Sequence, residues 1–166
     1  GLMRHACKLA DLVFVDALAE DTELFLDPHQ EGSRKLRGAR GNILRARLFI
    51  DVTLQVGQVG VLGLLDYRGA FDATSRKFLD STVKKAGARP VLQRFYRAQM
   101  AAAKGRVRMR QPDGTPVLSD SFDLGVGGIQ GGMSTPWCFI LAMTEIMAHE
   151  QEQGHDLDFA IRRECL

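Results

Sequence analysis

The sequence predicts an α/β or α+β domain in which a small sheet is covered by helices. Three observations favour this class: apolar residues recur at helical spacing in several long segments, residues 59 to 65 form an apolar run broken only by two glycines, and residues 106 to 110 alternate with period two. The chain has 166 residues, 45% of them hydrophobic and 25% charged, which is enough for one domain with its own core. Two complete domains are not expected.

The first expected element is an amphipathic helix that ends before Pro28. Its predicted buried side consists of apolar residues at helical intervals, namely Leu9, Leu12, Val13, Val15 and Leu18. A second helix is expected from Asn42, a residue type that caps helices, to about residue 57. Its predicted buried side is again apolar and consists of Ile43, Leu44, Leu48, Phe49 and Val52.

The run at residues 59 to 65 is predicted to be a central strand, because a strand buried on both faces is apolar throughout. Helical spacing returns at residues 78 to 86, ends at Gly87 and begins again after Pro90. Residues 106 to 110 and an extended stretch that reaches residue 124 are predicted to form a hairpin with one charged face. A helix is then expected over residues 135 to 152, and a further strand over residues 156 to 161.

Charge and composition exclude several classes of protein. The net charge of +2 excludes a uniformly basic surface that coats nucleic acid. The longest clean apolar stretch, residues 137 to 143, is too short for a bilayer, which takes about 20 residues. Cys7, Cys138 and Cys165 lack the spacing of a zinc site or of a disulfide scaffold. We therefore expect no membrane span and an intracellular, reducing compartment, with the nucleus as one option.

The first candidate for chemistry is a pair of carboxylates. Asp66 ends the apolar run and Asp72 follows six residues later. Ligand sites of α/β sheets open at the carboxyl ends of strands, so this position suits metal or nucleotide chemistry. The alternative is structural: Asp66 ends the strand in a turn, and Asp72 caps the next helix.

The second candidate is the glycine-rich segment at residues 125 to 136, which reads GVGGIQGGMSTP. Glycines let a main chain approach a phosphate or a base closely, and the N-terminus of a helix favours anions. The dinucleotide-binding fingerprint is not matched, because Gln130 occupies its third glycine position, and the phosphate-binding loop is not matched either. Taken alone, the segment is equally typical of a flexible turn.

Two basic stretches, at residues 34 to 47 and 104 to 110, form the third candidate. The arginines of the second stretch share one strand face and would form a row that matches a phosphate backbone. Taken singly, each stretch is also typical of a solvated surface. The predicted nucleic-acid contacts are Arg34, Lys35, Arg37, Arg106, Arg108 and Arg110.

In their order along the chain, these segments resemble the motifs of reverse transcriptases of the non-LTR retrotransposon and group II intron type. Residues 30 to 34, QEGSR, resemble the family's Gln-x-Gly-Phe-Arg, with Ser33 in place of Phe. Residues 64 to 72, LLDYRGAFD, resemble motif A, an apolar strand followed by Asp-x-x-x-Ala-Phe-Asp. Residues 127 to 136, GGIQGGMSTP, resemble motif B, Gly-x-Arg-Gln-Gly-x-x-x-Ser-Pro, with Ile129 in place of Arg. The resemblance covers residues 22 to 150, approximately.

The resemblance implies a partial polymerase, with a fingers-like part at residues 1 to 57 and a palm-like part at residues 58 to 166. It implies that Asp66 is the catalytic, metal-binding carboxylate and that the main-chain carbonyl of Tyr67 binds the same ion. It also implies that Phe71 is a steric gate, an aromatic ring that fills the space of a ribose 2′-hydroxyl. Gln130 and Gly131 would form the turn beneath the incoming nucleotide.

The implied activity is that of an RNA-directed DNA polymerase, a nucleotidyltransferase that uses an RNA template, a DNA primer and deoxynucleoside triphosphates. Its cofactor would be Mg²⁺, as two ions about 3.5 to 4 Å apart. Asp66 alone cannot hold this pair, and the family's motif C, an aromatic-x-Asp-Asp turn, is not in the sequence. The separated aspartates Asp156 and Asp158 do not replace it. We expect a fragment of a retrotransposon polymerase, or an incomplete element, that does not extend a primer alone.

Two other functions stay open. The chain could be a catalytically inactive RNA-binding remnant of such a polymerase, which a requirement for Mg²⁺ and nucleotide would distinguish from an enzyme. It could also be an unrelated interaction domain in which the motifs are accidental. In that case, replacing Asp66 or Phe71 with Ala would change stability only.

Overall fold

Helices dominate the computed structural model, which describes residues 5 to 64, 66 to 129 and 131 to 152. In this part of the chain, strands occur only in two small antiparallel sheets of two strands each. The fold is therefore α+β, in agreement with the broad class that the sequence predicts. No helix in the described residues is long and apolar enough to span a bilayer.

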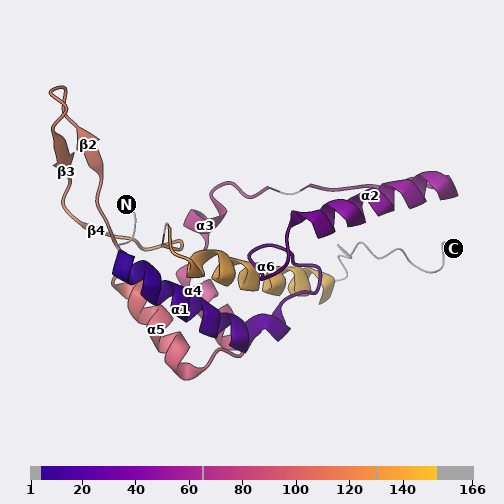
Figure 1. Cartoon of the computed structure of the whole chain (residues 1–166), viewed down its shortest axis with the longest axis horizontal. Helices are drawn as coiled ribbons and strands as arrows, with labels where there is room; N and C mark the ends of the chain where they lie inside the picture. Colours follow the sequence, from indigo (N-terminus) through magenta and orange to yellow (C-terminus); the bar gives the residue numbers. More distant parts are fainter. Residues whose placement is uncertain (1–4, 65, 130, 153–166) are drawn as a thin grey trace.

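Four helices form the core: α1 (His5–Thr22), α4 (Arg76–Lys85), α5 (Pro90–Ala101) and α6 (Ser134–Glu152). Both α5 and α6 pack against α1 and against α4, so the four helices enclose one apolar interior (Figure 1). The indole Nε1 of Trp137 donates a hydrogen bond of 2.9 Å to the buried Oγ1 of Thr22, which joins α6 to α1. The most deeply buried apolar residues are Leu18, Val83, Tyr96, Cys138, Leu141 and Ala142.

The ends of the core helices follow from local sequence. Ser75 caps α4, because its hydroxyl accepts a hydrogen bond from the amide of Phe78. Gly87 takes the left-handed backbone that ends this helix, with φ of +93°, and Pro90 begins α5. The predicted helices at residues 78 to 86, after Pro90 and at residues 135 to 152 are confirmed.

The first helix is confirmed, but its predicted buried side is only partly correct: Leu18 is fully buried and Val15 packs against the core. The buried positions of α1 are Asp11, Phe14, Leu18 and Thr22, whereas Leu9 and Val13 are each 64% exposed. A short 3-10 helix, η1 (Glu23–Phe25), continues the chain after α1. The helix is thus turned so that an acidic side chain, Asp11, faces the core.

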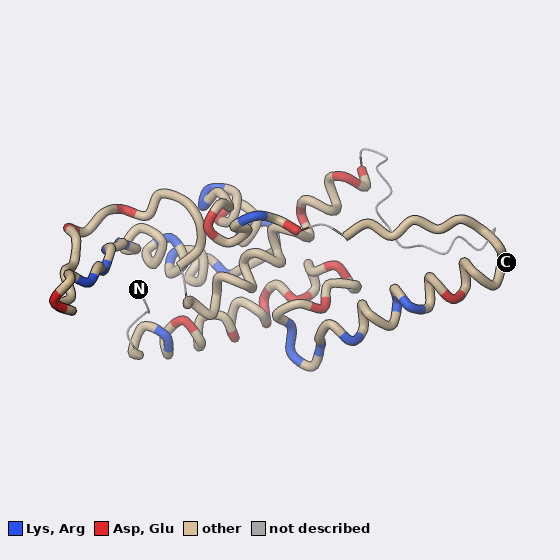
Figure 2. Tube along the Cα trace, turned by 90° about the horizontal axis from the view of Figure 1, so that it is seen from above, with Lys and Arg blue, Asp and Glu red and all other residues tan. Residues whose placement is uncertain are grey.

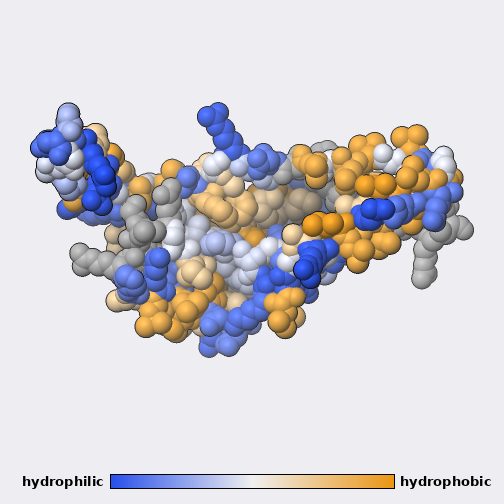
Figure 3. All heavy atoms as spheres, turned by 45° about the horizontal axis from the view of Figure 1, so that its top comes forward, coloured by the Kyte–Doolittle hydropathy of each residue, from blue (hydrophilic) through white to orange (hydrophobic). Residues whose placement is uncertain are grey.

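The helix α2 (Ala39–Val56) is also present, and it has no buried residue. Its predicted buried side is therefore wrong: Ile43, Leu44 and Leu48 are exposed, and Phe49 and Val52 are only half-buried. The helix projects away from the helical core (Figure 1). Apolar side chains cover much of its surface, at the right of Figure 3.

The predicted central strand at residues 59 to 65 is wrong for its described residues. Residues 58 to 64 are extended but belong to no sheet, and they run back beside α2 (Figure 2). Gly60 lies against Phe49 and Thr53 of α2, while Val59 and Leu64 are 96% and 90% exposed. A central strand needs a neighbour on each side, and no described segment pairs with this one. Leu65 and the predicted strand at 156 to 161 lie outside the described residues.

The predicted hairpin is confirmed. Strand β1 (Lys104–Gly105) pairs with β4 (Phe122–Asp123), and β2 (Arg108–Arg110) pairs with β3 (Pro116–Leu118). In the connecting turn, the Asp113 carboxylate accepts a hydrogen bond of 2.8 Å from the amide of Thr115, and Gly114 has a φ of +85°. The hairpin projects from the end of the molecule opposite α2 (Figure 1), with β2 and β3 exposed. The prediction that helices cover the sheet is wrong for these strands.

Candidate functional site

The two segments singled out for chemistry in the sequence meet at one pocket. This pocket lies between the short helix α3 (Ala70–Ala73) and the glycine-rich segment that leads into α6. Its volume is about 380 Å³, within the range of about 300 to 1,000 Å³ that small-molecule sites occupy. The lining residues are Gly69, Ala70, Phe71, Asp72, Gly128, Ile129, Gly131, Gly132, Thr135 and Pro136.

Main-chain hydrogen bonds hold the two sides of the pocket together. The amide of Gly128 donates to the carbonyl of Phe71 at 2.9 Å, and the amide of Gly127 donates to the carbonyl of Thr74 at 3.0 Å. Gly127 has a φ of +76°, and a Cβ atom there would lie 2.6 Å from the carbonyl oxygen of Asp72. The close approach of the two main chains therefore requires glycine at this position.

Arg76 fixes the same loop from the first turn of α4. Its Nε donates a hydrogen bond of 2.8 Å to the carbonyl of Gly127, and its Nη1 donates one of 2.7 Å to the carbonyl of Met100. A single guanidinium thus joins the glycine-rich loop to the end of α5. Sequence reasoning did not find Arg76, because an arginine at a helix start has no distinguishing pattern.

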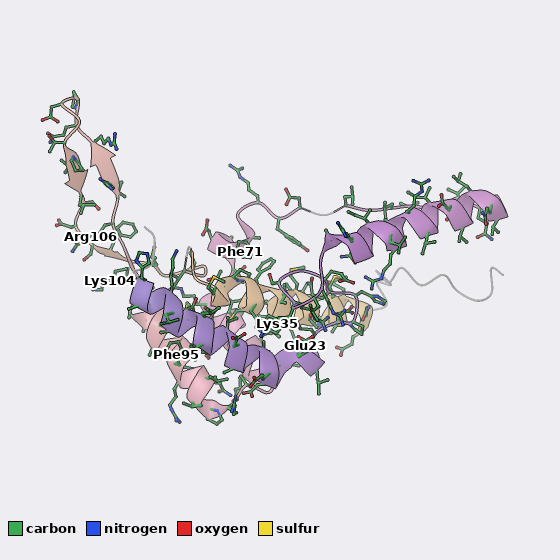
Figure 4. All side chains as sticks on the ribbon, viewed as in Figure 1. Glu23, Lys35, Phe71, Phe95, Lys104 and Arg106 are labelled. Atoms are coloured by element: carbon green, nitrogen blue, oxygen red, sulfur yellow. The ribbon has the colours of Figure 1, made fainter. Side chains whose placement is uncertain are left out.

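Among the predicted site residues, Phe71 has the best-defined position in the pocket. Phe71, labelled in Figure 4, lines the pocket and is 46% exposed. Its ring makes an edge-to-face contact with Phe139 of α6, with 5.0 Å between ring centroids. Gly131 lines the opposite side and has a φ of +78°. Gln130, the predicted partner of Gly131, lies outside the described residues.

The predicted metal ligands lie apart from this pocket lining. Asp66 and Tyr67 follow the extended segment, both are exposed, and neither lines the pocket. The described residues contain no group of three or more His, Cys, Asp or Glu side chains that could hold a metal ion. Asp72 lies within α3 and lines the pocket, whereas the cap of the following helix is Ser75, so the alternative of Asp72 as that cap is wrong.

The basic stretch at residues 34 to 47 is largely neutralised in the folded chain. Arg34 is 9% exposed, and its guanidinium donates to the Glu23 carboxylate and to the carbonyls of Asp27 and Gln30. These bonds turn the group inward, so the structure lends no support to its predicted role as a nucleic-acid contact, which stays a prediction. The ion pairs of this stretch are Arg34 with Glu23, Lys35 with Asp16, Arg45 with Glu31, and Arg47 with Asp51.

Lys35 and Arg37 remain at the surface, with bonds to other parts of the chain. The Lys35 ammonium lies 2.8 Å from the Asp16 carboxylate, and this hydrogen bond raises the pKa of Lys35 (Figure 4). The Arg37 guanidinium donates a hydrogen bond of 2.7 Å to the carbonyl of Pro28. Both groups are exposed, so a phosphate could reach them, though it would compete with these partners.

The arginines of the hairpin form the exposed basic surface. Arg108 and Arg110 lie on one face of β2, because side chains alternate along a strand, and Arg106 precedes that strand at the hairpin base (Figure 4). All three are exposed, and none forms an ion pair within residues 5 to 64, 66 to 129 and 131 to 152. Basic residues follow this arm of the chain, at the left of Figure 2.

The fold and the pocket together define an α+β protein with a small-molecule-sized site between α3 and the start of α6. Comparison of the chain with protein-family models, with curated proteins and with solved structures found no match. Function is therefore inferred from the residues and from their geometry.

Proposed function

We propose that this chain is the nucleotide-binding part of an RNA-directed DNA polymerase of the reverse transcriptase type. One observation carries the proposal: the segments that resemble motifs A and B, far apart in the sequence, line one pocket and are joined by main-chain hydrogen bonds. An accidental resemblance gives no reason for these two segments to meet. In the proposed reaction, a primer 3′-hydroxyl attacks the α-phosphorus of a deoxynucleoside triphosphate held in this pocket. The bond between the α- and β-phosphates breaks, and pyrophosphate leaves.

The pocket has the chemistry that a deoxyribose needs. The Phe71 ring forms an apolar surface at the edge of the pocket, and the contact with Phe139 restricts the movement of this ring. A 2′-hydroxyl placed against such a ring loses its hydrogen bonds to water without gaining others, so a ribonucleotide binds less well. Glycines on the opposite side leave room for a base or a sugar next to the main chain.

The described residues do not fit a pair of Mg²⁺ ions. Such a pair needs several hard oxygen ligands, and in the described residues Asp66 belongs to no group of three metal-ligating side chains. We therefore propose that these residues bind the nucleotide and the nucleic acid but do not supply a complete metal site. The chain alone is expected to incorporate no nucleotide into a primer.

The proposal is tested by titrating the folded chain with a deoxynucleoside triphosphate and with the matching ribonucleotide. The deoxynucleotide should bind more tightly, and Phe71→Val should bring the two dissociation constants together. Phe122→Val is the matched control, because Phe122 is also 46% exposed but lies on β4, away from the pocket lining. Equal binding of both nucleotides by the unaltered chain, or no binding, would overturn the proposal.

A second function has its own support, in the exposed arginines of the hairpin and in the lack of a metal-binding group within the described part of the chain. In this alternative the chain is an RNA-binding remnant without catalytic role. It predicts salt-dependent RNA binding that needs neither Mg²⁺ nor nucleotide and that is unchanged by Asp66→Asn. Nucleotide binding that depends on Phe71 separates the first function from this one.

A further inference from the structure

Asp11 is the most completely buried carboxylate among the described residues, with no exposed surface. It lies on α1, far in the sequence from the pocket, and it accepts hydrogen bonds from two other helices. Its Oδ1 accepts from Gln99 Nε2 at 2.9 Å and from the Ser134 hydroxyl at 2.6 Å. Its Oδ2 accepts from the Ser134 amide at 3.0 Å and from the Met133 amide.

These bonds explain why a carboxylate is tolerated in the core. The amides of Met133 and Ser134 lie at the start of α6, where main-chain N–H groups have no partner within the helix and the helix dipole favours a negative charge. Asp11 therefore acts as a cap for α6 from another helix. The partners of the Asp11 carboxylate are amides and a hydroxyl. Because these bonds are directional, they stabilise one position of the main chain at residues 133 and 134.

The same bonds reach the pocket. Residues 131, 132, 135 and 136 line it, and residues 133 and 134, which Asp11 holds, lie between them. A Cβ atom on Gly132 would lie 3.3 Å from Oδ2 of Asp11, which places the carboxylate directly behind the pocket wall. Main-chain bonds and Arg76 hold the first half of the loop at Gly127 and Gly128. In the second half, the Gly132 amide and the Thr135 hydroxyl donate to the nearby carbonyl of Ile129, whereas Asp11 joins this half to another helix.

We propose that Asp11 is a positioning residue of the nucleotide pocket. Asp11 holds residues 131 to 136 at the distance from Phe71 that a deoxynucleotide requires. This inference rests on the proposed function for the identity of the ligand, a deoxynucleotide. The positioning of residues 131 to 136 by Asp11 does not depend on the proposed function. Asp11 touches no nucleotide, because it is fully buried behind the wall. It acts through the amides of Met133 and Ser134.

The test compares Asp11→Ala with Asp21→Ala. Asp21 is the matched control, since it is also an aspartate of α1 and accepts a main-chain hydrogen bond of 2.8 Å, from the Arg89 amide, away from the pocket. Two quantities are measured on the folded proteins: deuterium exchange of the Met133 and Ser134 amides, and the dissociation constant of a deoxynucleoside triphosphate.

Asp11→Ala should remove the exchange protection of both amides and weaken nucleotide binding about tenfold, as expected when buried donors lose their acceptor. Asp21→Ala should lower the unfolding temperature while leaving both quantities unchanged. Asp11→Asn should restore part of the affinity, because its remaining oxygen still accepts from the amides. If Asp11→Ala does not fold, Ser134→Ala, which removes only the hydroxyl bond, should weaken binding about threefold.

Unchanged amide exchange and unchanged affinity in Asp11→Ala, or in Ser134→Ala if that is the variant that folds, would overturn the inference and leave the proposed function standing. If the unaltered chain binds no nucleotide, the proposed function fails, and the amide exchange still decides whether Asp11 holds the loop. A loss of protection and affinity in Asp21→Ala equal to that in Asp11→Ala would also overturn the inference, because general destabilisation would then explain both.

Discussion

The amide of Gly128 donates a hydrogen bond of 2.9 Å to the carbonyl oxygen of Phe71. This bond joins the aromatic side of the pocket to its glycine-rich side, although the whole of α4, α5 and the hairpin lie between them in the sequence. The pocket therefore exists only when the helical core has folded. Changes at its contact points should alter ligand binding and stability in ways that can be separated.

Replacement of Gly127 by Ala should be strongly destabilising. The left-handed backbone costs about 1 to 2 kcal/mol for a residue with a Cβ atom, and that atom would also lie 2.6 Å from the Asp72 carbonyl oxygen. We expect the free energy of unfolding to fall by about 2 kcal/mol or more, measured by denaturant unfolding. Gly125→Ala is the control, since its Cβ would meet no atom within 4 Å. A similar loss in both variants would contradict the assignment of the close approach to Gly127.

Arg34→Met should reduce stability without reducing RNA binding. The change removes the Arg34 donor from the carbonyl of Gln30 and one of two donors from the carbonyl of Asp27, which keeps the Gln30 amide. A buried polar group that loses its partner costs about 1 to 3 kcal/mol. Lys35→Met removes the same charge at the next residue, where the ion pair with Asp16 is exposed and screened by solvent, so its loss should change stability little. Thermal unfolding and RNA titration of both variants check this. Weaker RNA binding by Arg34→Met alone would show that the guanidinium can reach solvent.

The double variant Arg108→Ala and Arg110→Ala should weaken RNA binding with little change in stability. Both side chains are exposed on the hairpin and form no ion pair within the described part of the chain. Each lost phosphate contact should reduce the slope of log affinity against log salt by about one. Arg97→Ala is the control, because it removes a positive charge that is paired with Asp80 on the core. An unchanged salt slope would exclude the hairpin from the RNA interface.

Stability should fall at alkaline pH because of Cys138. Complete burial raises the pKa of its thiol from 9.0 to about 12, so the folded state keeps a proton that the unfolded state releases. The contribution of the protonated thiol to the free energy of unfolding is fully present below pH 9. It is lost as the pH rises toward 12, by up to about 1.4 kcal/mol per pH unit. Burial also raises the pKa of Tyr96, whose ordinary value is 10.0.

Denaturant unfolding at pH 8, 9, 10 and about 11 measures this effect, and Cys138→Ala should make the decline between pH 9 and 10 shallower. Ala leaves the Tyr96 contribution in place, so a smaller decline should remain above pH 10. An identical pH dependence in the variant and in the unaltered chain would show that the thiol does not titrate on unfolding.

The helices could be predicted from the sequence because their signals are local. Ser75, Gly87 and Pro90 define the ends of α4 and α5 through capping and backbone preference, without any long-range contact. The hairpin is local as well, because Gly114 closes its turn. The buried face could also be predicted for α4, where the helical spacing at residues 78 to 86 includes the buried Leu79, Thr82 and Val83. It could not be predicted for α2, nor fully for α1.

Long-range packing decided the incorrect predictions. Residues 59 to 64 are apolar enough for a central strand, but a strand also needs neighbours, which no local pattern supplies. The burial of Asp11 could not be predicted, because a buried carboxylate is rare unless other groups satisfy it, and the partners of Asp11 lie far along the chain. Its spacing from Phe14 and Leu18 was the one available signal, as these residues recur at helical intervals.

The hairpin leaves the core and returns to it at nearly the same point, because Lys104 and Asp123 are paired in register. Its outer strands contribute no residue to the pocket lining. The arm is therefore a module that can be shortened, lengthened or exchanged without opening the pocket, provided that the two residues at its base stay together. We expect a chain in which a two-residue turn replaces the arm to keep the pocket between α3 and α6 unchanged. Under the proposed function, changes in the arm would alter the contact with nucleic acid independently of the contact with the nucleotide.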